Sequence, residues 1–135
     1  MPNLPRWSDS LSVENPTIDD QHRQLIELCN RVANFTSASA PNAVNKYHGL
    51  LDELVTLVDR HFIAEEEILS GKRCPSFASH KAEHDIYRQH LSEMVASGRA
   101  GELHPANLYK LANDYLIRHM EVTDLACKEY LKAVD

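Results

Sequence analysis

Apolar residues recur every three or four positions in four successive segments of this chain, and this spacing constrains the fold more than any other feature. Residues spaced in this way lie on one face of an α-helix. The four series are Ile18, His22, Leu25, Cys29 and Val32; Tyr47, Leu51, Leu54, Val58, His61, Glu65 and Ile68; Phe77, His80, His84, Tyr87, Leu91 and Met94; and Leu108, Ala112, Tyr115, His119 and Val122. The spacing predicts four amphipathic helices, each burying the face that carries its series.

Helix-breaking residues separate the four series. Thr17 and Asp20, after Pro16, predict the start of the first helix as a capping box. The breaks between helices are predicted at Ser37 to Pro41, at Gly71 to Ser76, and at Gly98 to Pro105. The predicted fold is therefore all-α: an antiparallel up-down-up-down four-helix bundle over about 17–130. Residues 1–16 are predicted to form an extended N-terminal arm held by Trp7 and Leu11, within one domain spanning 1–135.

Length, charge and cysteine content exclude several classes of protein. A chain of 135 residues can bury a core without disulfides or a structural metal. It has no apolar run long enough to span a bilayer and no secretory signal, and its net charge of −6 includes no basic cluster. We therefore expect neither membrane insertion nor nucleic-acid binding. The three cysteines, of which Cys74 is expected to be exposed in a loop, suggest reduced thiols and a cytoplasmic location.

Six ionisable residues fall within the predicted buried faces. They are His22, His61, Glu65, His80, His84 and His119. A single inward histidine is ordinarily a hydrogen-bonded core residue, but burying six such groups without partners would cost several kcal/mol. Residues four apart lie about 40° apart around a helix, so His61 with Glu65, and His80 with His84, can converge on one centre. Five histidines exceed what one tetrahedral site needs, which favours two metal ions sharing a carboxylate.

At this point the residues resemble the hemerythrins, and especially their single-domain bacterial members. The motifs that carry the resemblance are Ile18-Asp19-Asp20-Gln21-His22, His61-x-x-x-Glu65, His80-x-x-x-His84 and His119-x-x-x-x-Asp124, and it runs from about Trp7 to Tyr130. It implies two non-heme iron ions that share a bridging oxo or hydroxo group. It also implies a division of ligands: His80, His84 and His119 on one iron, His22 and His61 on the other, and Glu65 and Asp124 bridging.

Asp124 is a predicted ligand on the resemblance alone. A step of five residues in an α-helix places it about 140° around the axis from His119, so either a distorted helix or a long reach is required. Without the resemblance, Asp124 would be interpreted as a solvated surface acid.

The resemblance implies a protein that binds molecular oxygen reversibly for transport, storage or delivery, and not an enzyme. The alternatives are a di-iron peroxidase or oxidase, nitric oxide detoxification, or an oxygen or redox sensor. Phe62, Tyr115 and Leu116 are predicted to exclude water from the site, with Leu116 over the oxygen pocket or, equally, an ordinary core leucine. His48, His90 and His104 fall outside the pattern and are predicted to be surface or capping residues.

Overall fold

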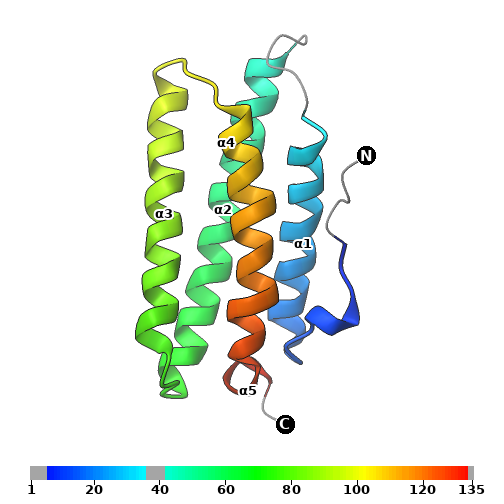
Figure 1. Cartoon of the computed structure of the whole chain (residues 1–135), viewed down its shortest axis with the longest axis vertical. Helices are drawn as coiled ribbons and strands as arrows, with labels where there is room; N and C mark the ends of the chain where they lie inside the picture. The colour runs from blue at the N-terminus through cyan, green and yellow to red at the C-terminus, as the bar shows by residue number, and fades with distance from the viewer. Residues whose placement is uncertain (1–5, 36–41, 134–135) are drawn as a thin grey trace.

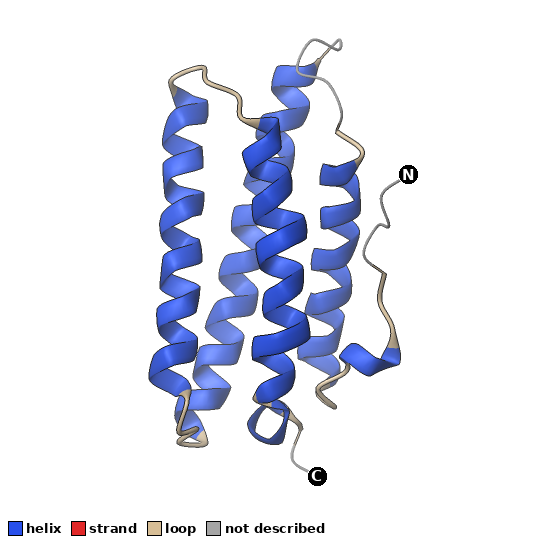
Figure 2. Ribbon diagram, viewed as in Figure 1, coloured by secondary structure: helices blue, strands red, loops and turns tan. Residues whose placement is uncertain are grey.

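The computed structural model of the chain describes residues 6–35 and 42–133. The long helices are α1 (Pro16–Ala33), α2 (Ala43–Gly71) and α3 (Phe77–Arg99). The fourth begins as α4 (Pro105–Tyr109) and continues through η2 (Lys110–Leu116) and η3 (His119–Asp124), before the short α5 (Lys128–Leu131). Successive helices run in opposite directions side by side, and the described residues include no strand (Figures 1 and 2). The predicted antiparallel four-helix bundle is confirmed.

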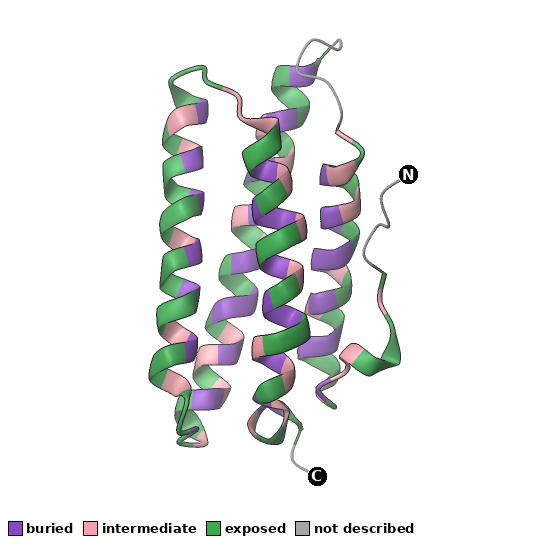
Figure 3. Ribbon diagram, viewed as in Figure 1, coloured by how far each residue is buried: buried purple, intermediate pink, exposed green. Residues whose placement is uncertain are grey.

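The core lies along the bundle axis, where each helix turns its apolar face inward (Figure 3). The larger cluster runs through the middle and one end of the bundle and includes Leu25, Leu54, Leu91 and Leu108. A second cluster lies where the α2–α3 turn meets the end of the fourth helix. It consists of Val13, Ile18, Leu69, Cys74, Cys127 and Leu131. Each fully buried leucine or isoleucine contributes roughly 1.5–3 kcal/mol, so burial of these faces is what holds the helices together.

The N-cap of helix α1 lies two residues earlier than the sequence suggested. Asn15 caps it, accepting hydrogen bonds from the backbone N–H of Thr17 (3.1 Å) and Ile18 (3.3 Å), with Pro16 in the first turn. The predicted capping box of Thr17 and Asp20 is therefore wrong, because an asparagine before Pro16 already satisfies the first free N–H groups. The Asn15 side-chain amide also donates to the carbonyl of Leu131 (2.9 Å), which ties the start of α1 to α5.

The turn between α2 and α3 folds inward. Helix α2 ends at Gly71, as predicted, and the backbone N–H of Cys74 donates to the carbonyl of Leu69 at 2.9 Å. Arg73 supplies the left-handed residue of this turn, with φ of 54°. The prediction of an exposed Cys74 is wrong: its side chain is only 6% exposed and packs in the second core cluster, because the turn carries it back over the helix end.

The fourth helix changes its winding. Segments η2 and η3 are π-helical, with hydrogen bonds that span five residues where an α-helix spans four. Because a π-helix has more residues per turn than an α-helix, the inward-facing positions differ from those that α-helical spacing predicts. Leu116 and Met120 are the residues that are buried. Tyr115 and Val122, predicted to face inward, are 59% and 57% exposed. The prediction failed there because it assumed 3.6 residues per turn throughout.

Two smaller predictions also need adjustment. Gly98, expected to mark a break, lies inside α3, which continues to Arg99; the turn comes at Gly101, where φ is 86°. A Cβ at Gly98 would lie 3.1 Å from the His48 ring, so a larger residue there would require this ring to shift by a few tenths of an ångström. In α2, Leu69 is fully buried, whereas Ile68 is only half-buried.

The N-terminal segment lies along α1 (Figure 1). Trp7 and Leu11 are partly buried against the main core, and Leu11 is the last residue of the single-turn helix η1 (Asp9–Leu11). The guanidinium of Arg23 lies 4.4 Å from the centre of the Trp7 ring, a cation–π contact. The predicted break at Ser37 to Pro41 lies outside the described residues, as do residues 1–5. None of the helices in the described part of the chain combines the length and apolar character needed to span a bilayer.

Candidate metal centre

The structure brings all seven predicted ligands together in the interior. Each is at most 5% exposed, and each helix contributes at least one: His22 from α1, His61 and Glu65 from α2, His80 and His84 from α3, and His119 and Asp124 from η3. Their donor atoms form two groups, each within 4.8 Å: Glu65, His80, His84, His119 and Asp124; and His22, His61, Glu65 and Asp124. The two carboxylates belong to both groups.

Glu65 presents one oxygen to each group. Its Oε1 lies 3.2 Å from Nε2 of His84 and 3.3 Å from Nε2 of His80. Its Oε2 lies 3.3 Å from Nε2 of His61. This carboxylate therefore has the orientation of a bridging ligand.

Asp124 divides its oxygens in the same way. Its Oδ1 lies 3.0 Å from Nε2 of His119 and 3.2 Å from Nε2 of His80. Its Oδ2 lies 2.9 Å from Nε2 of His22. With Glu65, it forms a second bridge between the same two groups of histidines.

The π-helical winding of η3 explains how Asp124 faces the same centre as His119. A step of five residues completes about one turn of a π-helix, so the two side chains project from one side. Of the two possibilities left open by the sequence, distortion of the helix is the one observed. Single π-turns are frequent at functional sites, because the extra residue re-aims a side chain without ending the helix.

The outward nitrogens of four histidines have their own partners, and sequence reasoning missed all of them. Nδ1 of His61 meets Gln21 Oε1 (2.9 Å), that of His84 meets Glu66 Oε2 (2.7 Å), that of His119 meets Glu83 Oε1 (2.9 Å), and that of His80 meets Cys127 Sγ (3.3 Å). Such contacts fix the ring orientation and leave Nε2 free to bind a metal. A usable signal was present: Gln21, Glu66 and Glu83 each adjoin a predicted ligand in the sequence.

The carboxylates attract positive charge strongly in the metal-free chain. Burial alone would lower the pKa of His119, but the charge of Asp124 and hydrogen bonds to Asp124 and Glu65 raise it to about 11. Burial likewise opposes the charged form of His80, whose pKa hydrogen bonds to Asp124 and Glu65 raise to about 10. For His61, the charge of Glu65 outweighs burial and raises the pKa to about 9. Protons therefore occupy this centre where a cation could replace them.

Several polar atoms of the centre lack hydrogen bonds, and this observation tests the fit to a metal. Oε2 of Glu65 and Oδ1 of Asp124 are buried, and neither has a hydrogen-bond partner in good geometry, although histidine nitrogens lie 3.3 and 3.0 Å away. Nε2 of His84 and Nε2 of His119 point at each other at 3.0 Å, as do those of His22 and His61. Ligands about 2.1 Å from one ion and at right angles to each other are separated by about 3 Å, so the donor set fits metal coordination.

An aromatic wall covers one side of the centre. The Phe62 ring stacks on His84, with centroids 3.8 Å apart and planes 4° apart, and is itself buried. Leu116 is fully buried in the same core cluster as Phe62. Tyr115, predicted to exclude water from the site, instead faces solvent beside His90.

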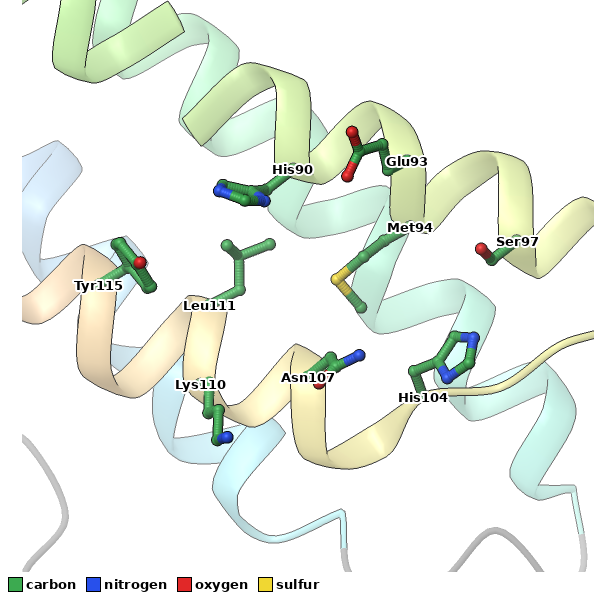
Figure 4. Close-up of a pocket in the computed structure, with 9 residues that line it drawn as sticks. All are labelled: His90, Glu93, Met94, Ser97, His104, Asn107, Lys110, Leu111 and Tyr115. Atoms are coloured by element: carbon green, nitrogen blue, oxygen red, sulfur yellow. The ribbon is translucent and has the colours of Figure 1, made fainter. Parts of the chain in front are cut away.

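The remaining histidines lie away from the centre. His90 is exposed, and His48 and His104 are half-buried. His90 and His104 line an open pocket of about 370 Å³ between α3 and the α4–η2 helix. Figure 4 shows these two side chains with Glu93 and Lys110 around the pocket. In the described part of the chain, none of these three histidines joins a group with metal-binding geometry.

Comparisons with known proteins agree with this geometry. Residues 14–130 match the family described as the hemerythrin HHE cation binding domain. A bacteriohemerythrin of Stenotrophomonas maltophilia is 29% identical over 94% of this chain and 81% of its own length. A hemerythrin-like protein of Naegleria gruberi is 29% identical over 97% of both chains. The crystal structure of a hemerythrin mutant superposes with a TM-score of 0.84 at 25% identity, covering 96% of this chain and 98% of that one. A bundle of this shape, with this set of buried ligands and this match over most of its length, belongs to the hemerythrin family.

Proposed function

We propose that this chain holds two non-heme iron ions, joined by an oxo or hydroxo group, and binds molecular oxygen reversibly. The observation that carries the proposal is the unequal division of ligands. One group offers three histidines and the other two, while Glu65 and Asp124 serve both. His22 and His61, with Glu65 and Asp124, would therefore hold an iron ion with one histidine fewer than its neighbour, and that ion would have a position free for a small molecule.

The chain's own residues suit a carrier. Bound at this centre, two ferrous ions would supply the two electrons that oxygen takes up. Phe62 and Leu116 are buried on the apolar side of the centre, where they limit the entry of water and protons that would release oxygen in a reduced form. The five neutral imidazoles also distinguish this donor set from the glutamate-rich sites of ferritin-like oxidases. We therefore propose a carrier and not an enzyme, with Leu116 lining the oxygen pocket.

The test is the visible absorption spectrum of the iron-loaded, reduced protein, kept from air, then oxygenated, then purged with inert gas. A carrier gives a band that appears with oxygen and disappears on purging over repeated cycles. Irreversible oxidation within one cycle would overturn the proposal in favour of a redox enzyme. Iron must be quantified in the same sample, because affinity order alone does not select iron over other divalent metals.

A further inference from the structure

Two of the three cysteines lie close together in the second core cluster. Sγ of Cys74 is 3.3 Å from Oγ of Ser76, and Sγ of Cys127 is 3.5 Å from the same oxygen. The distance between the two sulfur atoms is therefore at most the sum of these two distances. Cys127 Sγ is also 3.3 Å from Nδ1 of His80. A chain of contacts therefore runs from a proposed metal ligand through Cys127 and Ser76 to Cys74.

We propose that Cys74 and Cys127 are a peroxide-sensitive thiol pair that closes into a disulfide. Cys74 lies in the short turn between α2 and α3, and Cys127 lies at the junction of η3 and α5. Both positions are outside the long helices. A small shift of either segment, with rotation of the Ser76 hydroxyl out of the way, lets the two sulfurs meet without unwinding a long helix.

The chemistry balances with hydrogen peroxide as the oxidant. One cysteine sulfur attacks a peroxide oxygen, the O–O bond breaks, and a sulfenic acid and one water form. The second sulfur then attacks the sulfenic sulfur, the S–O bond breaks, and a disulfide and a second water form. Each sulfur loses one electron, the peroxide gains two, and both thiol protons end in water.

Burial restricts which oxidants can reach the pair. Cys74 and Cys127 are 6% and 4% exposed, so a molecule the size of peroxide can enter by small fluctuations, whereas a bulky disulfide reagent cannot. The inference rests on the proposed oxygen chemistry only for the origin of the peroxide, which would arise at the centre to which His80 belongs. Adding peroxide directly therefore tests the thiol pair by itself.

Cys29 provides an internal comparison. It is fully buried in the main core cluster, away from the second cluster, and its thiol donates to the carbonyl of Ala112 at 3.1 Å. If burial alone made a cysteine behave as a small apolar side chain, all three thiols would respond alike. The pair differs from Cys29 in having a second sulfur within reach.

A closed pair would act on the metal centre. The disulfide would join the turn just before the helix that carries His80 to a residue three positions after Asp124. It would also draw the Cys127 sulfur away from Nδ1 of His80, removing the contact that orients this ring. Oxidation of the pair by peroxide would thereby change the orientation of the His80 ring at the centre.

The experiment treats the metal-free chain with one equivalent of hydrogen peroxide, blocks free thiols with an alkylating agent in denaturant, and analyses a tryptic digest by mass spectrometry. Cleavage after Arg73 and Lys81 isolates Cys74, and cleavage after Arg118 and Lys128 isolates Cys127. The expected product is these two peptides cross-linked and two hydrogens lighter, with Cys29 alkylated. Both peptides remaining free and alkylated, or Cys29 cross-linking in equal yield, would overturn the proposal.

Two variants sharpen the result. Cys74→Ser should stop the reaction at a sulfenic acid on Cys127, which a 1,3-dicarbonyl probe labels, whereas Cys29→Ser should leave the cross-link yield unchanged. An unlabelled Cys127 in Cys74→Ser would count against the pair. Because no iron or oxygen is present, failure here leaves the oxygen-binding spectrum to be judged separately.

Discussion

Glu65 and Asp124 each face two sets of histidines with two different oxygens, so each carboxylate could serve two metal ions at once. All four carboxylate oxygens lie between 2.9 and 3.3 Å from a histidine Nε2. Both carboxylates are fully buried, and the neighbouring histidines hold the pKa of Glu65 and of Asp124 well below the ordinary value despite burial, which opposes their charge. The centre thus contains two buried carboxylate charges, which protons on the histidines balance in the metal-free chain and which bound cations could balance in their place.

Asp124→Asn should weaken binding of at least one of the two metal ions by more than about 100-fold, since a lost ligand costs more than the 10–100-fold lost with an outer partner. The measurement is the metal-to-protein ratio after loading and desalting, expected to fall from two towards one or less. Glu121→Gln is the matched control, because this acid lies three residues away on the same helix and is exposed. Equal metal content in both variants would show that Asp124 is not a ligand.

The metal-free chain should lose stability as pH rises from about 6.5 to 9 and beyond. His61, His80 and His119 have folded pKa values of about 9, 10 and 11, above the ordinary value of 6.5. The folded state therefore binds more protons than the unfolded state in this range, and their stabilising contribution is complete below pH 6.5 and is lost as pH passes the folded values. Urea unfolding at pH 6.5 and 9 measures the effect.

Metal-loaded protein should not show this loss between the same two pH values, because bound ions take the place of the protons. A metal-free chain equally stable at pH 6.5 and 9, or more stable at pH 9, would contradict the assigned proton binding.

At the scale of helices, the sequence predicts the existence and pairing of the elements well and their phase less well. The spacing of three and four identifies α1, α2 and α3, because apolar burial follows 3.6 residues per turn there. In the fourth helix the π-turns break that rule, so Tyr115 and Val122 are misplaced and Asp124 is recognised only by resemblance. The residue types of η2 and η3 do not distinguish a π-helix from an α-helix in the sequence, so the change of winding could not be predicted.

The partners of the histidine rings escaped prediction for a related reason. Gln21, Glu66 and Glu83 lie one residue from a ligand, about 100° around their helices, and polar residues there usually face solvent. Each bonds to a ring on a neighbouring helix. Contacts between helices depend on how each helix is rotated and how far it lies from its neighbour, and the periodicity of one helix gives neither quantity.

The cap of α1 gives a prediction at this scale. Asn15→Ala should lower the free energy of unfolding by about 1–2 kcal/mol, because it removes both the cap and the bond to the Leu131 carbonyl. Asn15→Ser keeps a capping oxygen but lacks the amide donor, so its loss should be roughly half as large. Urea unfolding of the metal-free chain separates the two; equal losses would mean that the cap contributes nothing.

For the whole molecule, metal binding and folding are one equilibrium, because the ligands come from all four helices. Metal at about 1,000 times its Kd should stabilise the fold by about 4 kcal/mol. A chelator should accordingly lower the Tm, by roughly 2–8 °C for each kcal/mol lost. Thermal unfolding followed by circular dichroism measures the shift, and Asp124→Asn should show a smaller one. A Tm unchanged by the chelator would mean that the metal-free bundle is already as stable as the loaded one.

Asp124, in the π-helical segment near the end of the fourth helix, also determines when during synthesis the centre can be completed. Asp124 emerges from the ribosome 102 residues after His22, with which it shares a contact of 2.9 Å. Because both groups of ligands need this aspartate, a nascent chain carrying its first three helices has histidines but neither complete group. At the proposed iron centre, capture of both ions would therefore follow synthesis of the fourth helix, so the growing chain would not carry a half-built redox site.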